Sequence, residues 1–149
     1  MKIHIGADHA GYELKNKLVL WLKEQGHEMT DFGAHEFNPT DDYPDFIEPV
    51  ARAIASDPER SRGIILGGSG QGEAMDANRF PGVRAAEFYG GDLNIVKIAR
   101  EHNDANILSL GTRFVSEEEA KKAVELFLDT FFSGDERHIR RIKKIDDGV

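Results

Sequence analysis

The chain has 149 residues, of which 19 are basic and 27 acidic, and its formal charge is −8 with histidine neutral. This length suits one domain, expected over residues 1–149, and the acidic balance argues against a general binder of nucleic acid or membrane surfaces. Cysteine is absent, which excludes disulfides, thiolate metal sites and a cysteine nucleophile. Because no apolar run approaches the ~20 residues that span a bilayer and no signal-peptide pattern is present, we expect a cytoplasmic protein.

Short apolar runs alternate with amphipathic stretches along the first third of the chain. Residues 2–7 predict a strand, and residues from about 10 to 25 predict a helix that Gly26 ends. A second, half-polar strand is expected at 27–32. After a loop rich in turn residues, a helix is expected at 44–56, because its first residue is a proline and proline suits a first helical turn.

The same alternation continues to the C-terminus. Ser116 and Glu119 have the spacing of a capping box, which predicts that a helix begins directly after Ser116. The remaining elements, in chain order, are a strand at 63–67, a glycine-rich loop at 68–72, a helix at 73–79, strands at 83–86 and 105–110 with a helix at 93–102 between them, a helix at 117–132, and a basic helix that ends near Asp147.

This repeated alternation of strand and helix predicts an α/β fold with a mainly parallel sheet and helices on both of its faces. Sheets of this kind bind ligands beyond the C-terminal ends of their strands. The residues expected at those ends are therefore the first candidates for a site, and they lie at 7–9, 67–73, 87–91 and 111–113.

The segment from Gly67 to Gly72 holds four glycines in six residues. Glycines let the backbone approach a ligand closely and turn several N–H groups toward one anion. The segment lacks the lysine of a nucleotide-binding P-loop and the register of a dinucleotide fingerprint. We interpret it as an anion cradle; the alternative is a sharp turn that binds nothing.

Polar side chains beside this loop allow two readings each. Glu73 follows the loop directly, and it either caps its own helix or acts as a general base. The sequence alone favours neither role. Asp8 and His9 end the first strand, where they suit contacts with a hydroxyl or a phosphate, although Asp8 equally suits an N-cap. His102 lies in a polar cluster before a buried strand, and it equally suits a helix end, where a histidine complements the helix dipole. The six histidines show no metal-binding spacing.

Arg137 and Arg141 lie four residues apart in the last helix and so share one face. Two guanidinium groups at that spacing suit a dianionic phosphate. From the residues alone we favour the simpler reading, in which the basic run complements the C-terminal end of its helix without a ligand.

Segments in order over nearly the whole chain resemble the type B ribose-5-phosphate isomerases and their sugar-phosphate isomerase relatives. They are Asp8-His9-Ala10-Gly11, Asp42-Tyr43-Pro44-Asp45, Gly67-Gly68-Ser69-Gly70-Gln71-Gly72-Glu73, Ala77-Asn78-Arg79-Phe80-Pro81-Gly82-Val83-Arg84-Ala85, Ala99-Arg100-Glu101-His102-Asn103-Asp104-Ala105-Asn106 and Arg137-His138-Ile139-Arg140-Arg141. The resemblance implies one Rossmann-like (flavodoxin-like) three-layer domain with a five-stranded parallel sheet. It also implies a homodimer, or a tetramer built from it, with shared active sites and a C-terminal helix that reaches the partner subunit.

The resemblance further implies an isomerase of the pentose phosphate pathway that interconverts ribose 5-phosphate and ribulose 5-phosphate through a cis-enediolate, without a metal or organic cofactor. Many family members carry a cysteine base at the position of Gly67. This chain resembles instead the subgroup in which a glutamate is the base, which gives that role to Glu73. His102 would assist ring opening, with His138 as the less favoured candidate.

The resemblance also assigns the substrate-binding residues. Backbone N–H groups from Ser69 to Gly72 would hold the enediolate oxyanion, and two arginines, Arg137 and Arg141, would reach the substrate phosphate from the partner subunit. The full expected set is Asp8, His9, Tyr43, Gly68, Ser69, Gly70, Gln71, Gly72, Asn103, Arg113, Arg137, His138 and Arg141, of which Asp8, Tyr43 and Asn103 would orient sugar hydroxyls and His9 and Arg113 would join the phosphate grip.

Two other functions stay open at this point. The substrate could be another phosphosugar, such as a four-carbon ketose phosphate or the 6-phosphate of allose or galactose, because Gln71 and Asp76 replace the small apolar residues expected there. The chain could also be a flavodoxin-like phosphate-binding module without catalysis. The pKa of Glu73 is open as well, because nearby arginines lower the pKa of a carboxyl and desolvation raises it.

Overall fold

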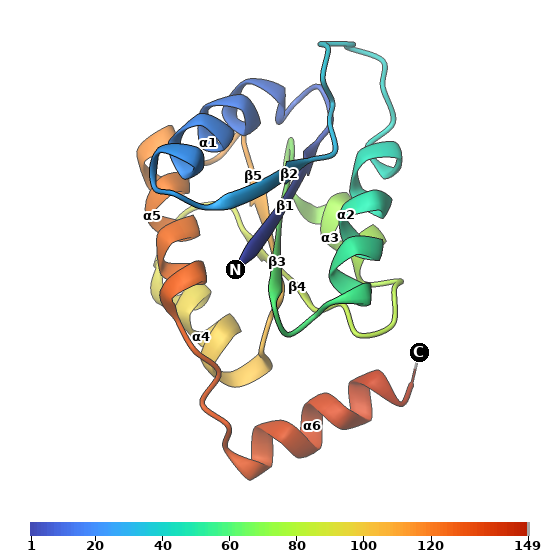
Figure 1. The fold of residues 1–149 in the computed structure, drawn as a ribbon, viewed down its shortest axis with the longest axis vertical. Coiled ribbons are helices and arrows are strands. Elements are labelled where there is room, and N and C mark those ends of the chain that lie inside the picture. The colour runs from blue at the N-terminus through green and yellow to red at the C-terminus, as the bar shows by residue number, and fades with distance from the viewer. Residues whose placement is uncertain (149) are drawn as a thin grey trace.

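Five parallel strands form one sheet in the order β2-β1-β3-β5-β4 in the computed structural model, which describes residues 1–148 (Figure 1). The expected domain over 1–149 is thus described except for residue 149. The strands are β1 (Lys2–Ala7), β2 (Glu28–Asp31), β3 (Ser61–Gly67), β4 (Ala85–Phe88) and β5 (Ile107–Gly111). The helices are α1 (Tyr12–Glu24), α2 (Pro44–Ser56), α3 (Gln71–Ala77), α4 (Asn94–Asn103), α5 (Glu117–Asp129) and α6 (Glu136–Asp146).

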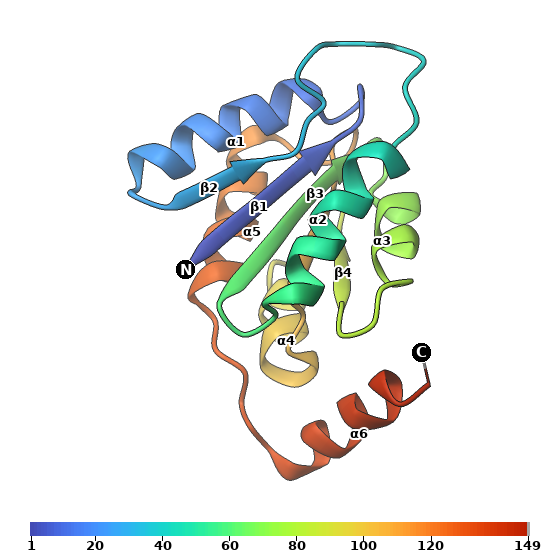
Figure 2. The same ribbon diagram turned by 45° about the vertical axis from the view of Figure 1, so that its right-hand side comes forward.

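The sheet lies between two layers of helices (Figures 1 and 2). One face is covered by α1, α4 and α5, and the other by α2 and α3. The middle strand β3 serves both faces, because Ile64 and Leu66 belong to the first core and Ile65 to the second. Successive side chains of a strand point to opposite faces, so a strand covered on both sides must be apolar throughout, as β3 is.

The expected α/β class, the parallel sheet of five strands and the helices on both faces are confirmed. The strand order differs from that of flavodoxin, 2-1-3-4-5, in its last two strands. Here β5 pairs with β3, and β4 lies at the edge outside it. The sequence gives no signal for this exchange, because both strands are short apolar runs that follow a helix.

Several expected boundaries were wrong by about two residues. The helix after the glycine loop begins at Gln71 rather than Glu73, because Gly70 takes the left-handed conformation (φ 82°) and the chain turns into α3 directly after it. The strand expected at 83–86 lies at 85–88, since Arg84 N–H donates instead to the side chain of Asn106 (2.8 Å).

The capping box at the start of α5 is confirmed. The amide of Glu119 donates to the hydroxyl oxygen of Ser116 (3.2 Å), and the amide of Ser116 donates to the carboxylate of Glu119 (2.8 Å). That helix ends at Asp129, three residues before the expected 132, because Thr130 is already extended.

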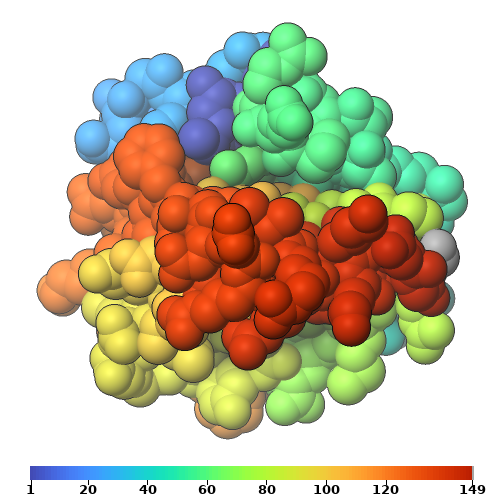
Figure 3. All heavy atoms as spheres, turned by 90° about the horizontal axis from the view of Figure 1, so that it is seen from below, coloured from blue at the N-terminus to red at the C-terminus, as the bar shows by residue number. Residues whose placement is uncertain are grey.

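The last helix, α6, lies outside the layers, at the N-terminal edge of the sheet (Figures 1 and 2), and runs across the surface of the molecule on that side (Figure 3). His138 is its one buried residue among those that the structure describes. Ile139 and Ile145, on the same helix, are 50% and 56% exposed. In the part of the chain from 1 to 148, no helix has both the length and the apolar character needed to cross a membrane.

Candidate active site

The glycine loop after β3 is held in place by residues in β5 and directly after it. The hydroxyl of Ser109 donates to the carbonyl oxygen of Gly70 (2.6 Å), and the amide of Thr112 donates to that of Gly67 (2.9 Å). The hydroxyl of Thr112 lies 2.9 Å from the carbonyl oxygens of both Gly67 and Ala10. These bonds join the ends of β1, β3 and β5 into one rigid edge, where open α/β sheets place their ligands.

Glu73 occupies the space that a side chain at position 67 would fill. Its carboxyl group folds back from the first turn of α3 onto the end of β3, and a Cβ added to Gly67 would overlap it. Glu73 is 4% exposed, so the carboxyl is nearly removed from solvent. The absence of a side chain at Gly67 is therefore what allows a carboxyl group to lie against this strand end.

The environment of this carboxyl raises the pKa of Glu73, chiefly because burial penalises the charged form. The hydrogen bond from its own backbone N–H lowers the pKa, while the negative charges of Asp8, Glu87 and Asp76 raise it further. Of the two opposing effects that the sequence left open, desolvation thus prevails within this chain.

Arg113 and Tyr43 approach the loop where it has no side chains. The Arg113 guanidinium lies 3.1–3.2 Å from the position that a Cβ of Gly68 would take. The Tyr43 ring lies 2.9–3.2 Å from the corresponding position at Gly72. The hydroxyl oxygen of Ser69 accepts a hydrogen bond from the amide of Gln71 (3.2 Å). The expected residues Tyr43, Gly68, Ser69, Gly70, Gln71, Gly72, Glu73 and Arg113 are therefore brought together at one edge of the sheet.

Asp8 and His9 join this group from the end of β1. One oxygen of Asp8 accepts hydrogen bonds from the amides of Ala10 (3.0 Å) and Gly11 (3.2 Å), so the carboxylate holds the turn that leads into α1. The ring nitrogen Nδ1 of His9 lies 2.6 Å from the carboxylate of Asp41, which also accepts the His9 amide (3.1 Å). A carboxylate only accepts, so Nδ1 carries the proton and Nε2 is left for a ligand.

Asp41 is a site residue that the sequence analysis missed, because its segment was interpreted only as a turn-rich loop. In the described part of the chain, ligand atoms of Asp8, His9 and Asp41 lie within 4.8 Å of one another, a spacing that could hold a metal ion. Glu87, at the end of β4, was also missed as an individual residue, although it falls within the expected strand-end segment 87–91. Burial raises the pKa of the Glu87 carboxyl, and a side-chain hydrogen bond with Gln71 lowers it.

The other expected residues lie at the opposite, N-terminal edge of the sheet. His102 and Asn103 are the last residues of α4, shortly before β5 begins. The His102 ring stacks on that of His138 from α6, with centroids 4.5 Å apart and an interplanar angle of 14°. Arg137 and Arg141 are exposed on α6.

The two edges are too far apart for these two groups of residues to meet within one chain. β3 has seven residues, which at roughly 3.3 Å per residue separate the edges by about 20 Å. Glu73 lies at one end of this span, and the pair of histidines lies at the other. The structure therefore brings ten of the expected residues together and gathers His102, Asn103, Arg137, His138 and Arg141 elsewhere.

Comparisons with known proteins find the same family of isomerases over nearly the whole chain. The family model for ribose/galactose isomerase matches residues 3–145. A Mycobacterium tuberculosis protein named ribose-5-phosphate isomerase B is 44% identical over 142 residues, which are 95% of this chain and 86% of that protein. The crystal structure of ribose-5-phosphate isomerase B from Mycoplasma genitalium with bound ribulose-5-phosphate has a TM-score of 0.94 at 38% identity, covering 99% of this chain and 95% of that one. The Clostridium thermocellum ribose-5-phosphate isomerase B structure has a TM-score of 0.91 at 44% identity, covering 99% and 96%.

The burial of Glu73 predicts that Glu73→Gln stabilises the fold at neutral and alkaline pH. Because the pKa of Glu73 is raised on folding, ionising this carboxyl opposes folding, and the penalty is fully present above the folded pKa. Below the unfolded pKa of about 4.3, both states are protonated and the penalty is absent. The melting temperature of Glu73→Gln should therefore exceed that of the parent at pH 8, and the difference should vanish near pH 4.

Glu118→Gln is the matched control, because this exposed carboxylate bonds to Lys122 (2.6 Å), which lowers the pKa of Glu118. It should give no gain in melting temperature at pH 8. An equal or lower melting temperature for Glu73→Gln than for the parent at pH 8 would contradict the assignment of a buried, destabilising carboxylate.

Proposed function

The chain belongs to the ribose/galactose isomerase family, and from this premise we propose that it interconverts ribose 5-phosphate and ribulose 5-phosphate in the cytoplasm, as a step of the pentose phosphate pathway. The observation that carries the proposal is the buried Glu73 carboxyl beside the glycine loop, at the edge where Arg113 and Tyr43 also converge. A family resemblance alone would leave the chemistry to analogy, whereas a desolvated carboxyl beside backbone amides supplies a base and an anion site together.

Glu73 acts as the general base on the opened sugar. It removes the proton from C2 of the aldose, the electron pair forms the C1–C2 double bond, and negative charge develops on the C1 oxygen. Return of the proton to C1, with transfer of the O2 proton to O1, yields the ketose. A base is most effective when its pKa lies near the working pH, and burial moves the pKa of Glu73 upward in that direction.

The backbone amides from Ser69 to Gly72 stabilise the enediolate oxyanion, each donor being worth about 2.7–4 kcal/mol by comparison with other oxyanion holes. Arg113 and His9 Nε2 bind the phosphate, and Asp8 and Tyr43 orient the sugar hydroxyls. Asp41 keeps the His9 ring in the orientation that presents Nε2, through the 2.6 Å contact at Nδ1. No step of this scheme needs a metal ion or an organic cofactor.

His102 opens the sugar ring in the site of a second copy. A histidine suits proton transfer at the ring oxygen because its pKa lies near neutrality. The separation of the two sheet edges supports a symmetric dimer in which the N-terminal edge of one subunit covers the C-terminal edge of the other. Such an isologous pair gives two identical sites, each with Glu73 from one chain and His102, Asn103, Arg137 and Arg141 from its partner.

Exposed apolar residues on and before α6 support this assembly. Phe131 is 85% exposed, and Ile139 and Ile145 are about half exposed, on a segment that packs lightly on its own chain. A dimer of such dimers would give the tetramer.

A different phosphosugar is the second candidate substrate. Its support is the pair formed by Gln71 and Glu87, which lies beside Glu73 and adds a carboxyl group to the substrate edge. A carboxylate there suits a sugar with an extra hydroxyl, such as a 6-phosphate of allose or galactose.

A coupled assay of ribose 5-phosphate conversion, run with a chelator and beside a panel of four- to six-carbon phosphosugars, tests the proposed function. The parent protein should convert ribose 5-phosphate fastest, and Glu73→Gln should abolish turnover while it still binds the substrate. Faster turnover of a six-carbon phosphate would select the second candidate. Binding without turnover across the panel, or near-parent activity of Glu73→Gln, would refute the mechanism.

Gly67→Ala should leave the fold intact and remove most of the activity. The atoms that the new methyl group meets are the end of the flexible Glu73 side chain, which can move aside. A displacement on the order of 1 Å costs about 100-fold in rate, so kcat should fall by at least that factor while the circular dichroism spectrum is unchanged. Retention of more than half of the parent kcat would show that the carboxyl does not need this space.

Mixed dimers test whether the sites are shared. Glu73→Gln and His102→Gln should each be inactive alone. After unfolding and refolding together, random pairing makes half of the dimers mixed, and each mixed dimer has one intact site, so about a quarter of the parent activity should return. If each chain holds a complete site, the mixture stays inactive.

A further inference from the structure

A polar cavity of about 530 Å³ lies at the N-terminal edge of the sheet, away from the glycine loop. It is bounded by the start of β3, the end of α4 and the segment that joins α5 to α6. Its lining includes Arg62, Arg84, Arg100, Asp104, Phe131 and Phe132. Neither the proposed mechanism nor the resemblance to the family gives these arginines a role.

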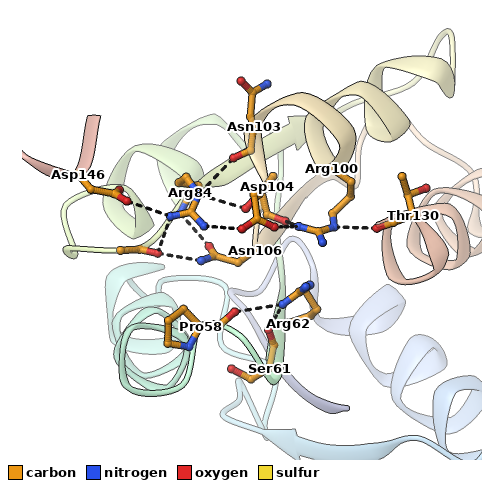
Figure 4. A network of polar contacts seen from close by, with 12 residues as sticks. Pro58, Ser61, Arg62, Arg84, Arg100, Asn103, Asp104, Asn106, Thr130 and Asp146 are labelled. Atoms are coloured by element: carbon orange, nitrogen blue, oxygen red, sulfur yellow. Dashed lines mark hydrogen bonds and ion pairs between the residues drawn. The ribbon is translucent and has the colours of Figure 1, made fainter. Parts of the chain in front are cut away.

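Two of the three arginines are paired (Figure 4). One oxygen of Asp104 accepts from Arg84 Nη2 (3.0 Å) and the other from Arg100 Nη1 (2.7 Å). Arg84 also reaches Asp146 of α6 at 3.4 Å, a longer contact. Both oxygens of Asp104 are thus engaged by Arg84 and Arg100.

Arg62 is buried without a carboxylate. It is 9% exposed, and its Nη1 donates to the backbone carbonyls of Pro58 (3.1 Å) and Ser61 (2.7 Å). Among residues 1–148, no ion pair includes Arg62, and its Nε and Nη2 donate to no atom there; the same holds for Nη2 of Arg100, which is 3% exposed. These nitrogen atoms are not among the fully buried ones, so their N–H groups remain open to solvent and can donate to a ligand in the cavity.

Three carboxylates, those of Glu59, Asp104 and Asp146, line the cavity with the three arginines, and Asp104 and Asp146 pair with Arg84 and Arg100 but not with Arg62. Burial lowers the pKa of Arg62, the charge of Arg100 and then of Arg84 lowers it further, and Asp104 only partly offsets them. Phe131 and Phe132 add apolar surface to the lining. The cavity therefore offers free N–H donors of Arg62 and Arg100 together with some apolar surface.

We propose that this cavity is a second anion site, which binds the phosphate group of a small phosphorylated metabolite through Arg62 and Arg100. Guanidinium N–H groups that converge from two side chains suit the several oxygens of a phosphate better than the two oxygens of a carboxylate. The volume exceeds that of a phosphate alone and lies in the range of pockets for small organic ligands.

The cavity is distinct from the phosphate grip proposed for the substrate. Arg113 and His9 lie at the other edge of the sheet, and Arg137 and Arg141 do not line the cavity. The side chain of Asn103 points away from the arginine network (Figure 4). Arg62 itself bonds only to Pro58 and Ser61 within residues 1–148, so its loss leaves every residue of the proposed isomerase site with its own contacts, and the two proposals fail separately.

Calorimetric titration of the full chain with inorganic phosphate tests the second site. Two variants separate the sites: Arg113→Gln weakens binding at the glycine loop, and Arg62→Gln weakens binding in the cavity. We expect two classes of phosphate site in the parent and one in each variant, with the affinity of the cavity lowered about tenfold or more by Arg62→Gln. A parallel titration with citrate tests a carboxylate ligand, and citrate should bind the cavity more weakly than phosphate does.

Arg60→Gln is the matched control, because Arg60 is a close neighbour that is exposed and pairs with Asp57 at the surface (3.1 Å). It should bind phosphate as the parent does. Arg62→Lys keeps the charge but loses the planar guanidinium group. It should fold, and its affinity for phosphate should lie between those of the parent and Arg62→Gln. This variant separates loss of binding from loss of the fold. Unchanged two-site binding in both Arg62 variants, or a single site in the parent that Arg113→Gln removes, would overturn the proposal.

Discussion

The contact between the Glu73 carboxyl and the bare backbone of Gly67 is the constraint on which the proposed chemistry depends. It buries a carboxyl group at the end of the central strand and raises the pKa of Glu73. Two further glycines of the loop act in the same way, because Gly68 and Gly72 leave room for Arg113 and Tyr43. One feature, the absence of side chains along this strand end, thus brings together the proposed base, the proposed anion site and the arginine proposed to bind the phosphate.

The parallel topology has a second consequence. Helices that connect parallel strands run back to the N-terminal edge, so the end of α4 carries His102 and Asn103 away from Glu73. Lengthening a loop could not reunite them across about 20 Å of sheet. The proposed dimer, with a second copy placed edge to edge, brings them together by symmetry and also gives the lightly packed α6 a surface to cover.

The sequence predicted those features that depend on local pattern. The apolar run of β3, the capping box of Ser116 and the strand-end position of Glu73 all follow from short-range spacing. The pairing of His9 with Asp41 joins residues 32 apart in the chain, and no local pattern indicates it. The same is true of Arg62, Arg84 and Arg100, which meet only because β5 inserts between β3 and β4 and the end of α4 packs beneath them.

The most direct measurement is the titration of the Glu73 carboxyl itself, followed by the ¹³C shift of its side-chain carbon in the parent and in Gly67→Ala. We expect a pKa for Glu73 above the value of about 4.3 that exposed glutamates show, and a return toward that value in Gly67→Ala, where the methyl group pushes the carboxyl toward solvent. A pKa at or below the ordinary value in the parent, unchanged by the substitution, would contradict it.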